Sequence, residues 1–462
     1  MLQHPTGNYS NASLQGSYVY EIRGGASSNL SPYRQVGVFS ADGSGNLGKP
    51  APGSDDSSVS ASGSQVTGIY QISSDGTGFI TMTTSLGQIT LAVTMVSHSK
   101  LYLMEADNVL DAVGVAELQD PSVIGTTPSG TFVFRLHQEV SAQGTVPASQ
   151  IGAITVPSGA VNGALDQNLG GTFSSPNLTW TFDAPGSLGR GTGSFVNATT
   201  SFSTNFVYYI VTAGKVVLLV SNAGAVGSGS AEAQTGIVSS GLSGSYAFGS
   251  NGDDTNYLSG IFNTVATAGS FTASSGSIST TEDVMQDGNY STGNTSNCYS
   301  AASNGRVTVT DCSSPTPLQI FWMVSSSRAF FLDNSPSTFE DGTADLQSTS
   351  SFMPSTIKGQ FAMVMGGIDV TPELLSRIGT LQFDGTGKLT LNELANASAS
   401  GGGAQSPGLL SGPYSVSSNG RITGNLSGGG LDLVMYAVSG SDAYALQIDP
   451  GTNTSGTVSL QH

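Results

Sequence analysis

The stretch Gly456-Thr457-Val458-Ser459-Leu460-Gln461 is a short strand signature that occurs in four copies along the chain. The earlier copies begin at Gly114, Gly229 and Gly342, and each contains a glycine, any residue, a small apolar residue, a polar residue, Leu or Ala, and a closing Gln. The closing glutamines recur about every 114 residues, and four copies with so little drift indicate a tandem repeat.

An opening signature marks the other end of each repeat. It consists of Gly, then Ser, Thr or Gln, then Tyr or Phe, and it begins at Gly16, Gly130, Gly244 and Gly359. Units of roughly 100 residues can each bury a core of their own, so we interpret them as tandem domains and not as a solenoid of dependent repeats. The predicted domains are residues 14–119, 128–234, 242–347 and 357–461.

Each repeat alternates apolar and polar residues with the period of two that is typical of half-buried strands, as at Tyr18, Tyr20 and Ile22. Short segments of this kind, separated by Gly- and Asp-rich turns without room for a crossover helix, predict an antiparallel all-β fold. We predict four tandem domains, each an eight-stranded up-and-down barrel of the lipocalin or streptavidin kind, with a β-sandwich as the alternative. The only helical turn predicted is at residues 371–375, where Thr371 and Pro372 resemble a helix start.

The composition limits the possible partners of the protein. The 462 residues carry a net charge of −18 with only 13 Lys and Arg, and these do not cluster. Nucleic-acid binding and docking on an anionic membrane both require basic groups, so neither is predicted. No apolar segment is long enough for a transmembrane helix. The first five residues do not resemble a signal peptide, so either a leader was removed or there never was one. The expected location is nevertheless secreted or cell-surface, with the leader not present in this chain.

Both cysteines, Cys298 and Cys312, lie in the third repeat. A two-residue turn at Asn304-Gly305 would bring them within one residue of facing each other on neighbouring strands, and a bulge or a three-residue loop would close the gap. We therefore predict a cross-strand disulfide, with two buried free thiols as the alternative. A disulfide favours an oxidising compartment outside the cytoplasm.

The motifs that usually carry chemistry are weak or absent in the sequence. Residues 43–48 fit GxGxxG, but Lys49-Pro50 follows and cannot start the helix that a dinucleotide site needs. The four histidines are scattered, and no Gly-x-Ser-x-Gly elbow occurs. Aspartates in glycine-rich turns, such as Asp253-Asp254, are interpreted as turn residues and not as calcium ligands. No catalytic residue, metal ligand or cofactor site is predicted.

Five aromatic residues are the remaining candidates for a site. Four share one position in the repeats, and the fifth, Trp322, lies on the same strand face as Ile320 and Val324. We interpret all five as core residues, with a ligand-lining role as the alternative if any barrel is hollow. The four residues at the shared position are Tyr70, Trp180, Tyr299 and Tyr414.

The complete pattern resembles a tandem β-repeat of about 115 residues in uncharacterised secreted and surface proteins of soil bacteria. The resemblance covers nearly the whole chain and is carried by residues 244–248, 38–45, 412–421 and 342–347. The second repeat departs most, because residues 156–159 lack the Asp-Gly-x-Gly turn. The resemblance implies export and repetition, and it assigns no functional residue.

These observations favour an exported, surface-associated protein with a structural or adhesive role and no catalysis. Four weakly charged domains on short linkers are expected to form an extended string suited to multivalent contact with carbohydrate, small apolar molecules or protein at the cell surface. The alternative is a binding module that holds a small apolar molecule or a carbohydrate inside one or more barrels.

Overall fold

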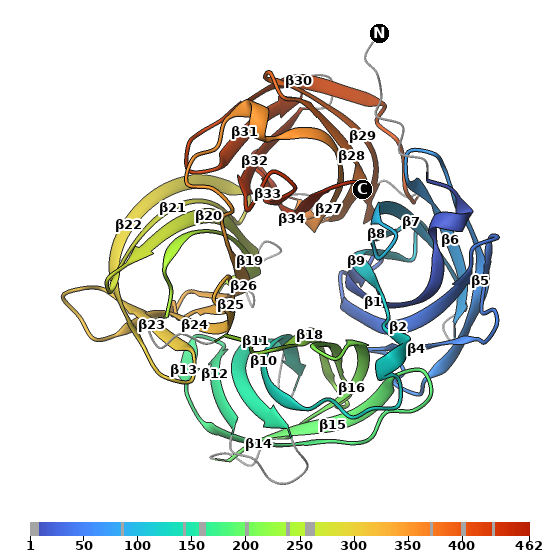
Figure 1. The fold of residues 1–462 in the computed structure, drawn as a ribbon, viewed down its shortest axis with the longest axis horizontal. Coiled ribbons are helices and arrows are strands. Elements are labelled where there is room, and N and C mark those ends of the chain that lie inside the picture. Colours follow the sequence, from blue (N-terminus) through green and yellow to red (C-terminus); the bar gives the residue numbers. More distant parts are fainter. Residues whose placement is uncertain are drawn as a thin grey trace. The chain divides into compact units, whose positions relative to one another are not determined.

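The computed structural model describes residues 9–84, 87–141, 145–156, 163–198, 203–236, 241–254, 264–369, 373–398, 403–426 and 430–462. The chain forms two compact units. Unit 1 comprises Met1–Pro121 and Thr349–His462, and unit 2 comprises Ser122–Ser348. Each unit contains two closed antiparallel β-barrels, and each barrel has eight strand positions, so the predicted fold is confirmed (Figure 1).

Barrel 1 belongs to unit 1, and its strands follow one another around the ring until β9 pairs with β1. The short strands β3 and β4 share the position between β2 and β5. The strands are β1 (Gln15–Ala26), β2 (Pro32–Asp42), β3 (Asn46–Leu47), β4 (Gly53–Ser57), β5 (Ser64–Ile72), β6 (Thr77–Thr84), β7 (Gly87–Ser97), β8 (Lys100–Glu105) and β9 (Leu110–Leu118).

Barrel 2 belongs to unit 2 and closes through the pairing of β10 with β18. Strand β13 pairs only with β12 and forms a small hairpin beside the ring. The strands are β10 (Gly130–Ser141), β11 (Thr145–Val156), β12 (Gly163–Leu169), β13 (Thr172–Ser174), β14 (Asn177–Phe182), β15 (Arg190–Asn197), β16 (Ser203–Thr212), β17 (Lys215–Val220) and β18 (Ala225–Ala233).

Barrel 3, also in unit 2, is a ring of eight consecutive strands. They are β19 (Gly244–Asp254), β20 (Thr264–Ser274), β21 (Ser277–Gln286), β22 (Asn289–Ala301), β23 (Arg306–Thr310), β24 (Pro317–Ser325), β25 (Arg328–Asp333) and β26 (Thr338–Leu346).

Barrel 4 completes unit 1 with the same topology. Its strands are β27 (Lys358–Asp369), β28 (Glu373–Asp384), β29 (Lys388–Ala397), β30 (Leu409–Val416), β31 (Arg421–Leu426), β32 (Leu431–Ala437), β33 (Asp442–Gln447) and β34 (Thr452–Leu460).

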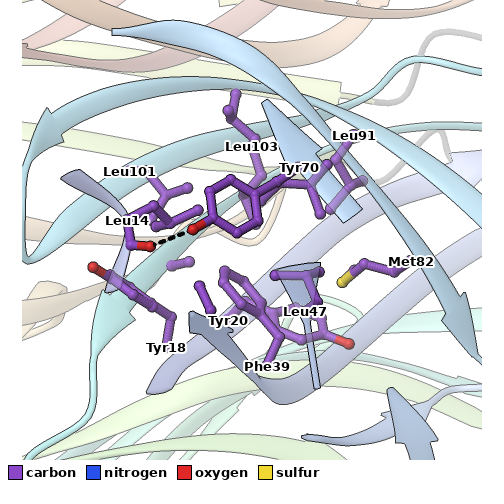
Figure 2. Packing of buried hydrophobic residues seen from close by; sticks show 14 of the residues in the cluster. Leu14, Tyr18, Tyr20, Phe39, Leu47, Tyr70, Met82, Leu91, Leu101 and Leu103 are labelled. Atoms are coloured by element: carbon purple, nitrogen blue, oxygen red, sulfur yellow. Dashed lines mark hydrogen bonds between the residues drawn. The ribbon is translucent and has the colours of Figure 1, made fainter. Parts of the chain in front are cut away.

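The alternation seen in the sequence separates the inside of each barrel from the outside. In barrel 1, Tyr18, Tyr20 and Ile22 point inward and join Phe39 and other buried residues in one apolar cluster (Figure 2). Barrels 2, 3 and 4 each contain a corresponding cluster of buried side chains. Burial of these apolar surfaces is the main source of stability of each barrel.

The helical turn predicted at residues 371–375 is wrong where the structure describes it. Strand β28 begins at Glu373, and Leu375 pairs with both Gly367 and Ala397. Strand pairing on both sides overrides the local helix-start signal, while residues 371 and 372 lie outside the described residues. The described part of the chain has 3₁₀ turns at η1 (Asn11–Ser13), η2 (Pro121–Val123) and η4 (Pro354–Thr356).

Within each unit the two barrels pack against each other through their outer faces. In unit 2, Val133 and Ile151 of barrel 2 share a buried cluster with Trp322 of barrel 3. In unit 1, Tyr102 of barrel 1 shares a buried cluster with Val364 of barrel 4. The expectation of a string of separate domains is therefore wrong within each unit, because outward-facing apolar residues join the barrels in pairs.

Candidate functional site

The three tyrosines at the shared repeat position use their hydroxyl groups inside the barrels. Tyr70 donates to the carbonyl oxygen of Leu14 at 2.8 Å, and Tyr299 donates to that of Leu242 at 2.7 Å (Figure 2). Tyr414 donates to the carbonyl oxygen of Ile357 at 3.2 Å. Each acceptor lies two residues before the opening glycine of its repeat. These hydrogen bonds therefore hold the segment just before the first strand of the repeat against the barrel interior.

Trp180 occupies the shared position in barrel 2 and has no hydroxyl group to donate. Its ring stacks on Phe195 at a centroid distance of 5.9 Å and meets the edge of Phe182 at 4.9 Å. A cavity of about 10 Å³ lies nearby, lined by Phe134, Leu178 and other residues. That volume accommodates about one water molecule and is far below the several hundred Å³ of a typical ligand pocket.

Trp322 lies on the outer face of barrel 3 and not in its interior. The ring is completely buried against barrel 2, and its indole Nε1 donates to Oδ2 of Asp166 at 2.8 Å. Strand alternation correctly groups it with Ile320 and Val324, which belong to the same cluster. The sequence could not reveal this location, because inward and outward apolar faces of a strand look alike when both are buried.

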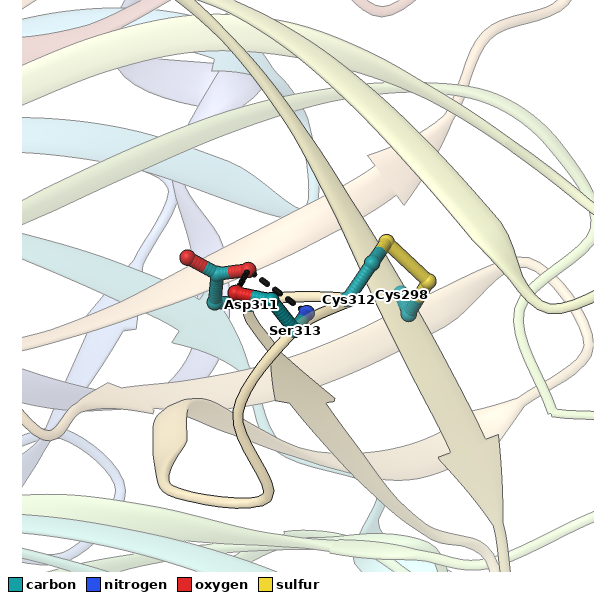
Figure 3. Close-up of a disulfide and its surroundings, with 4 residues drawn as sticks. All are labelled: Cys298, Asp311, Cys312 and Ser313. Carbon is teal, nitrogen blue, oxygen red and sulfur yellow. Dashed lines mark hydrogen bonds between the residues drawn. A yellow bond between two sulfur atoms is a disulfide. The ribbon is translucent and has the colours of Figure 1, made fainter.

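The disulfide between Cys298 and Cys312 is present, with a Cα–Cα distance of 4.9 Å (Figure 3). The predicted register is wrong, because Cys298 pairs with Thr310 and Cys312 lies in the loop beyond β23. The loop has three residues, as the prediction allowed, since the amide of Ala302 donates to the carbonyl of Arg306 and residues 303–305 lie between them. Its position shifts the register away from the one in which the two cysteines would face each other. The bond therefore joins β22 to the loop that follows its neighbour.

Asp166 of barrel 2 is the centre of the polar contacts with barrel 3. The carboxylate is buried and accepts from the guanidinium of Arg306 at 2.7 and 2.8 Å, in addition to the indole of Trp322. The hydroxyl of Ser175 is a fourth donor at 2.6 Å. A bidentate hydrogen bond between an arginine and a carboxylate fixes the relative orientation of the two side chains, so this contact specifies how barrels 2 and 3 pack.

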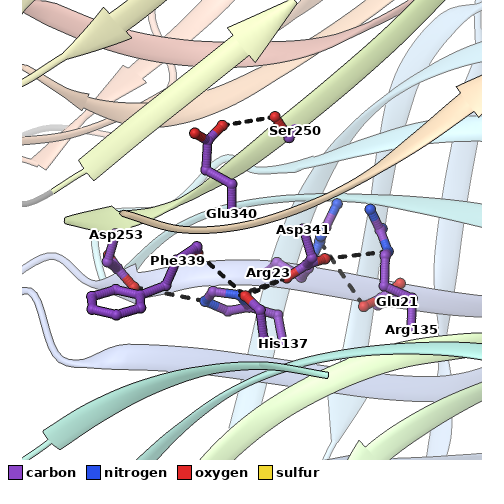
Figure 4. Close-up of polar contacts among 10 residues, drawn as sticks. Glu21, Arg23, Arg135, His137, Ser250, Asp253, Phe339, Glu340 and Asp341 are labelled. Carbon is purple, nitrogen blue, oxygen red and sulfur yellow. Dashed lines mark hydrogen bonds and ion pairs between the residues drawn. The ribbon is translucent and has the colours of Figure 1, made fainter. Parts of the chain in front are cut away.

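A second polar group at the same interface surrounds His137 of barrel 2 (Figure 4). Its Nδ1 lies 2.9 Å from Oδ2 of Asp341 in barrel 3, and its Nε2 lies 3.7 Å from Oδ2 of Asp253. Arg135 approaches the other oxygen of Asp341 at 3.4 Å. Ser149 donates to Asp341 Oδ2 at 3.0 Å.

These contacts determine the charges of the group. Burial alone would lower the pKa of His137, but its bonds to Asp253 and Asp341 outweigh this effect and raise the pKa to about 9. Burial opposes ionisation of Asp341, yet the bond from His137 and the charge of Arg135 lower its pKa to about 2. The pair is therefore ionised at neutral pH and links the two barrels electrostatically.

The arrangement of Ser149, His137 and Asp341 is not that of a catalytic triad. In a triad the serine and the carboxylate contact opposite nitrogens of the imidazole. Here Ser149 Oγ and Asp341 Oδ2 both lie near Nδ1, at 3.3 and 2.9 Å. Ser149 is fully buried and donates its proton to the carboxylate, so it cannot serve as an exposed nucleophile.

Unit 2 is expected to lose the stabilising contribution of His137 in alkaline solution. Because the folded pKa of about 9 exceeds the unfolded value of about 6.5, this contribution is fully present below pH 6.5 and is lost as the pH rises through about 9. We expect His137→Gln to differ most from wild type near pH 6 and least near pH 9.5. Urea unfolding at each pH measures the difference, and a pH-independent difference would contradict the assignment. Titrating groups that both proteins share cancel in the comparison.

The interface in unit 1 repeats contacts of the interface in unit 2. Asn168 of barrel 2 donates through Nδ2 to three carbonyl oxygens in the β25–β26 connection of barrel 3. Asn396 of barrel 4 donates in the same way to three carbonyl oxygens in the β8–β9 connection of barrel 1. Barrel 4 therefore contacts barrel 1 through the same surfaces that join barrel 2 to barrel 3.

The closing signature of the repeat is part of this shared surface. Gln234 Nε2 donates to the carbonyl oxygen of Met323 at 2.8 Å, and Gln461 Nε2 donates to that of Met95 at 2.7 Å. The side chain at the polar position of the closing signature also contacts the neighbouring barrel. In unit 2 this residue is Glu232, which forms an ion pair with Arg328 at 2.8 Å. In unit 1 the corresponding Ser459 lies 2.8 Å from the hydroxyl of Tyr102.

Unit 1 differs in the charge of its interface. Burial, reinforced by Asp107, raises the pKa of Glu105 well above its ordinary value. Burial also raises the pKa of Asp111 to about 7, against a hydrogen bond from Ser376 of barrel 4. Unit 2 also has such a carboxyl group, since burial raises the pKa of Asp333 to about 6, but it carries the His137–Asp341 ion pair in addition.

The sequence did not reveal the residues that join the barrels. The repeated glutamine and the recurrence of asparagine at 168 and 396 were signals that a polar side chain has a structural role. Asp166, Arg135 and His137 gave no such signal, because their partners lie more than 100 residues away in another repeat.

The described residues contain no group of three or more His, Cys, Asp or Glu side chains placed to hold a metal ion. In the same part of the chain, no helix is long and apolar enough to cross a membrane.

Comparisons with known proteins add little to this description. No protein-family model matches the chain, and no curated protein is similar to it in sequence. A mutant of the vaccine antigen transferrin binding protein B from Haemophilus parasuis Hp5 matches 78% of this chain and 83% of its own, at 8% identity and a TM-score of 0.20. Intact Ap-TbpB, with N and C lobes, matches the same shares at 8% identity and a TM-score of 0.18. Similarity at this level carries no argument about function.

Proposed function

We propose that the protein is an exported, surface-associated repeat protein with a structural or adhesive role and no catalysis. The observation that carries the proposal is the packing of the barrels. Buried apolar side chains form a cluster inside each barrel, and apolar residues on the outer faces join the barrels in pairs. Rigid paired barrels suit a protein that presents outer surfaces to partners.

Export is supported by the disulfide, since such bonds persist in oxidising compartments outside the cytoplasm. The acidic surface supports solubility there, with a net charge of −18. Catalysis receives no support from the most enzyme-like group of side chains, because Ser149 is buried and wrongly placed relative to His137.

The rival hypothesis, a binding module that holds a small apolar molecule or a carbohydrate inside a barrel, requires an internal cavity of a few hundred Å³. The described cavity in barrel 2, lined by Phe134, Leu178 and Phe195, measures about 10 Å³ and leaves no room there for such a ligand.

Protease treatment of intact producing cells tests the proposed location. The protein should be cleaved on whole cells while a cytoplasmic marker stays intact, and protection until the cells are lysed would overturn the proposal.

A thermal-shift screen against fatty acids and oligosaccharides tests the rival hypothesis. A ligand at 100 times its dissociation constant would add about 2.7 kcal/mol to the stability of the domain that binds it, and we expect no such shift.

A further inference from the structure

In barrel 3, the hairpin of β21 and β22 extends beyond the neighbouring strand β23. Ten residue pairs join β21 to β22 without a register shift, ending at Gln286↔Asn289. Only four pairs join β22 to β23, ending at Cys298↔Thr310. Among the described residues, positions 291–297 of β22 therefore have a partner strand on one side only.

The other edge of this segment presents backbone groups in a regular row. In an antiparallel ladder, successive residues turn their N–H and C=O groups alternately to one side and the other. The amide of Tyr299 donates to the carbonyl of Gly276 on the β21 side at 2.8 Å. Counting back from Tyr299, the backbone groups of Thr292, Asn294 and Ser296 face away from β21, toward the open edge.

Among the described residues, this edge shows none of the features by which proteins block strand addition. Such features include lysine, proline, bulges and covering segments. Residues 289–301 contain neither proline nor any charged residue, and the ladder to β21 has no bulge. Ser291, Thr292, Thr295 and Ser296 are all exposed.

The edge is also held in place at both ends. Asp287 and Gly288 form the turn with positive φ angles of 50° and 74°, the conformation that matches the twist of a two-residue hairpin. At the other end, the disulfide joins Cys298, the last residue paired with β23, to the loop beyond that strand. Preorganisation of this kind lowers the entropy lost when a partner strand binds.

The charges around the edge favour a cationic partner. The chain has no Lys, Arg or His between Lys215 and Arg306, whereas Glu282 and Asp287 are partly exposed on or next to the hairpin and Asp311 is exposed in the loop beyond β23. A second copy of the chain would bring the same acidic groups and a net charge of −18.

We propose that the open edge of β22 binds an extended, basic peptide segment of another protein, which adds as a further strand. Backbone hydrogen bonds to Thr292, Asn294 and Ser296 supply the affinity, and the surrounding carboxylates select for positive charge. The inference deepens the proposed adhesive function and rests on it, since it names one surface and one class of partner.

The test uses a synthetic nine-residue peptide of alternating Lys and Val, and a control peptide with Gln in place of Lys. Binding to the full chain is measured by fluorescence anisotropy. Asn294→Pro removes an edge-facing N–H that the barrel ladder does not use, and proline is tolerated on such an edge. Asn294→Ala is the matched control, because both variants lose the hydrogen bond from Thr281 to the Asn294 side chain.

We expect the Lys peptide to bind the wild type and Asn294→Ala alike, and to bind Asn294→Pro at least tenfold more weakly. The Gln peptide should bind more weakly than the Lys peptide, and 0.5 M salt should reduce the difference. Equal binding to both variants, or no binding at ~1 mM peptide, overturns the proposal. Dimerisation of the wild type that Asn294→Pro abolishes also overturns it, in favour of a second copy.

Circular dichroism and the melting temperature show whether Asn294→Pro is folded. If it is not, Ser296→Pro offers the same test at another edge-facing position. Failure of peptide binding leaves the cell-surface location intact, because protease treatment of whole cells tests that location separately.

Discussion

Replacing Asp166 with alanine is expected to lower the free energy of unfolding of unit 2 by about 3–5 kcal/mol, the usual cost of removing one partner of a buried ion pair. The carboxylate accepts two bonds from Arg306 and one from the indole of Trp322. Without it, the fully buried indole N–H loses its acceptor, while the guanidinium, whose side chain is 25% exposed, keeps only its bond to Thr308. Urea unfolding monitored by tryptophan fluorescence measures the change, because both tryptophans of the chain lie in unit 2.

Glu232→Ala is the matched control for Asp166→Ala. Glu232 pairs with Arg328 across the same interface at 2.8 Å, but the two side chains are 14% and 34% exposed. Water can replace a partner there, so we expect a loss of less than about 1 kcal/mol. Equal losses in the two variants would show that burial of Asp166 does not determine its contribution.

The sequence was sufficient to predict the topology of the individual barrels. Tyr18, Tyr20 and Ile22 alternate with Ser17, Val19 and Glu21, and the face of the strand that carries Tyr18, Tyr20 and Ile22 points inward. Short turns leave each strand to pair with the next one, so the up-and-down order follows from the chain itself. The four copies of the repeat then predict four barrels.

The same reasoning could not predict which barrels pack against each other. An exterior apolar residue such as Trp322 and an interior one such as Phe321 alternate along β24, and both are buried. Sequence alternation cannot distinguish a strand buried on both faces by a second barrel from a strand with one exposed face. Pairing of barrel 1 with barrel 4, which are distant in sequence, leaves no local signal at all.

The disulfide shows how a local pattern can give the correct bond through an incorrect register. Proximity of Cys298 and Cys312 follows from any tight turn between them. The pairing itself depends on the loop at residues 303–305, whose Gly305 has a φ angle of 89°. A three-residue loop that ends in such a glycine shifts the register relative to a two-residue turn.

Replacing both cysteines by serine is expected to destabilise unit 2 by about 3 kcal/mol, the chain-entropy value for a loop of about 15 residues. The cysteines are separated by 14 positions, and the bond closes the loop where β22 and β23 part. Tryptophan fluorescence during urea unfolding measures this loss. Addition of a reducing agent to the wild type should reproduce it, whereas the double variant should not respond.

The same variant links stability to the open edge of β22. Without the bond, residues 291–297 depend on β21 alone for their position, so their amides should exchange hydrogen faster in the double variant than in the wild type, while the amides of β21, which is also paired with β20, change less. Binding of the Lys peptide should weaken correspondingly, because part of its affinity is used to order the strand. Unchanged exchange and unchanged affinity in the double variant would show that β21 holds the edge in place without the disulfide.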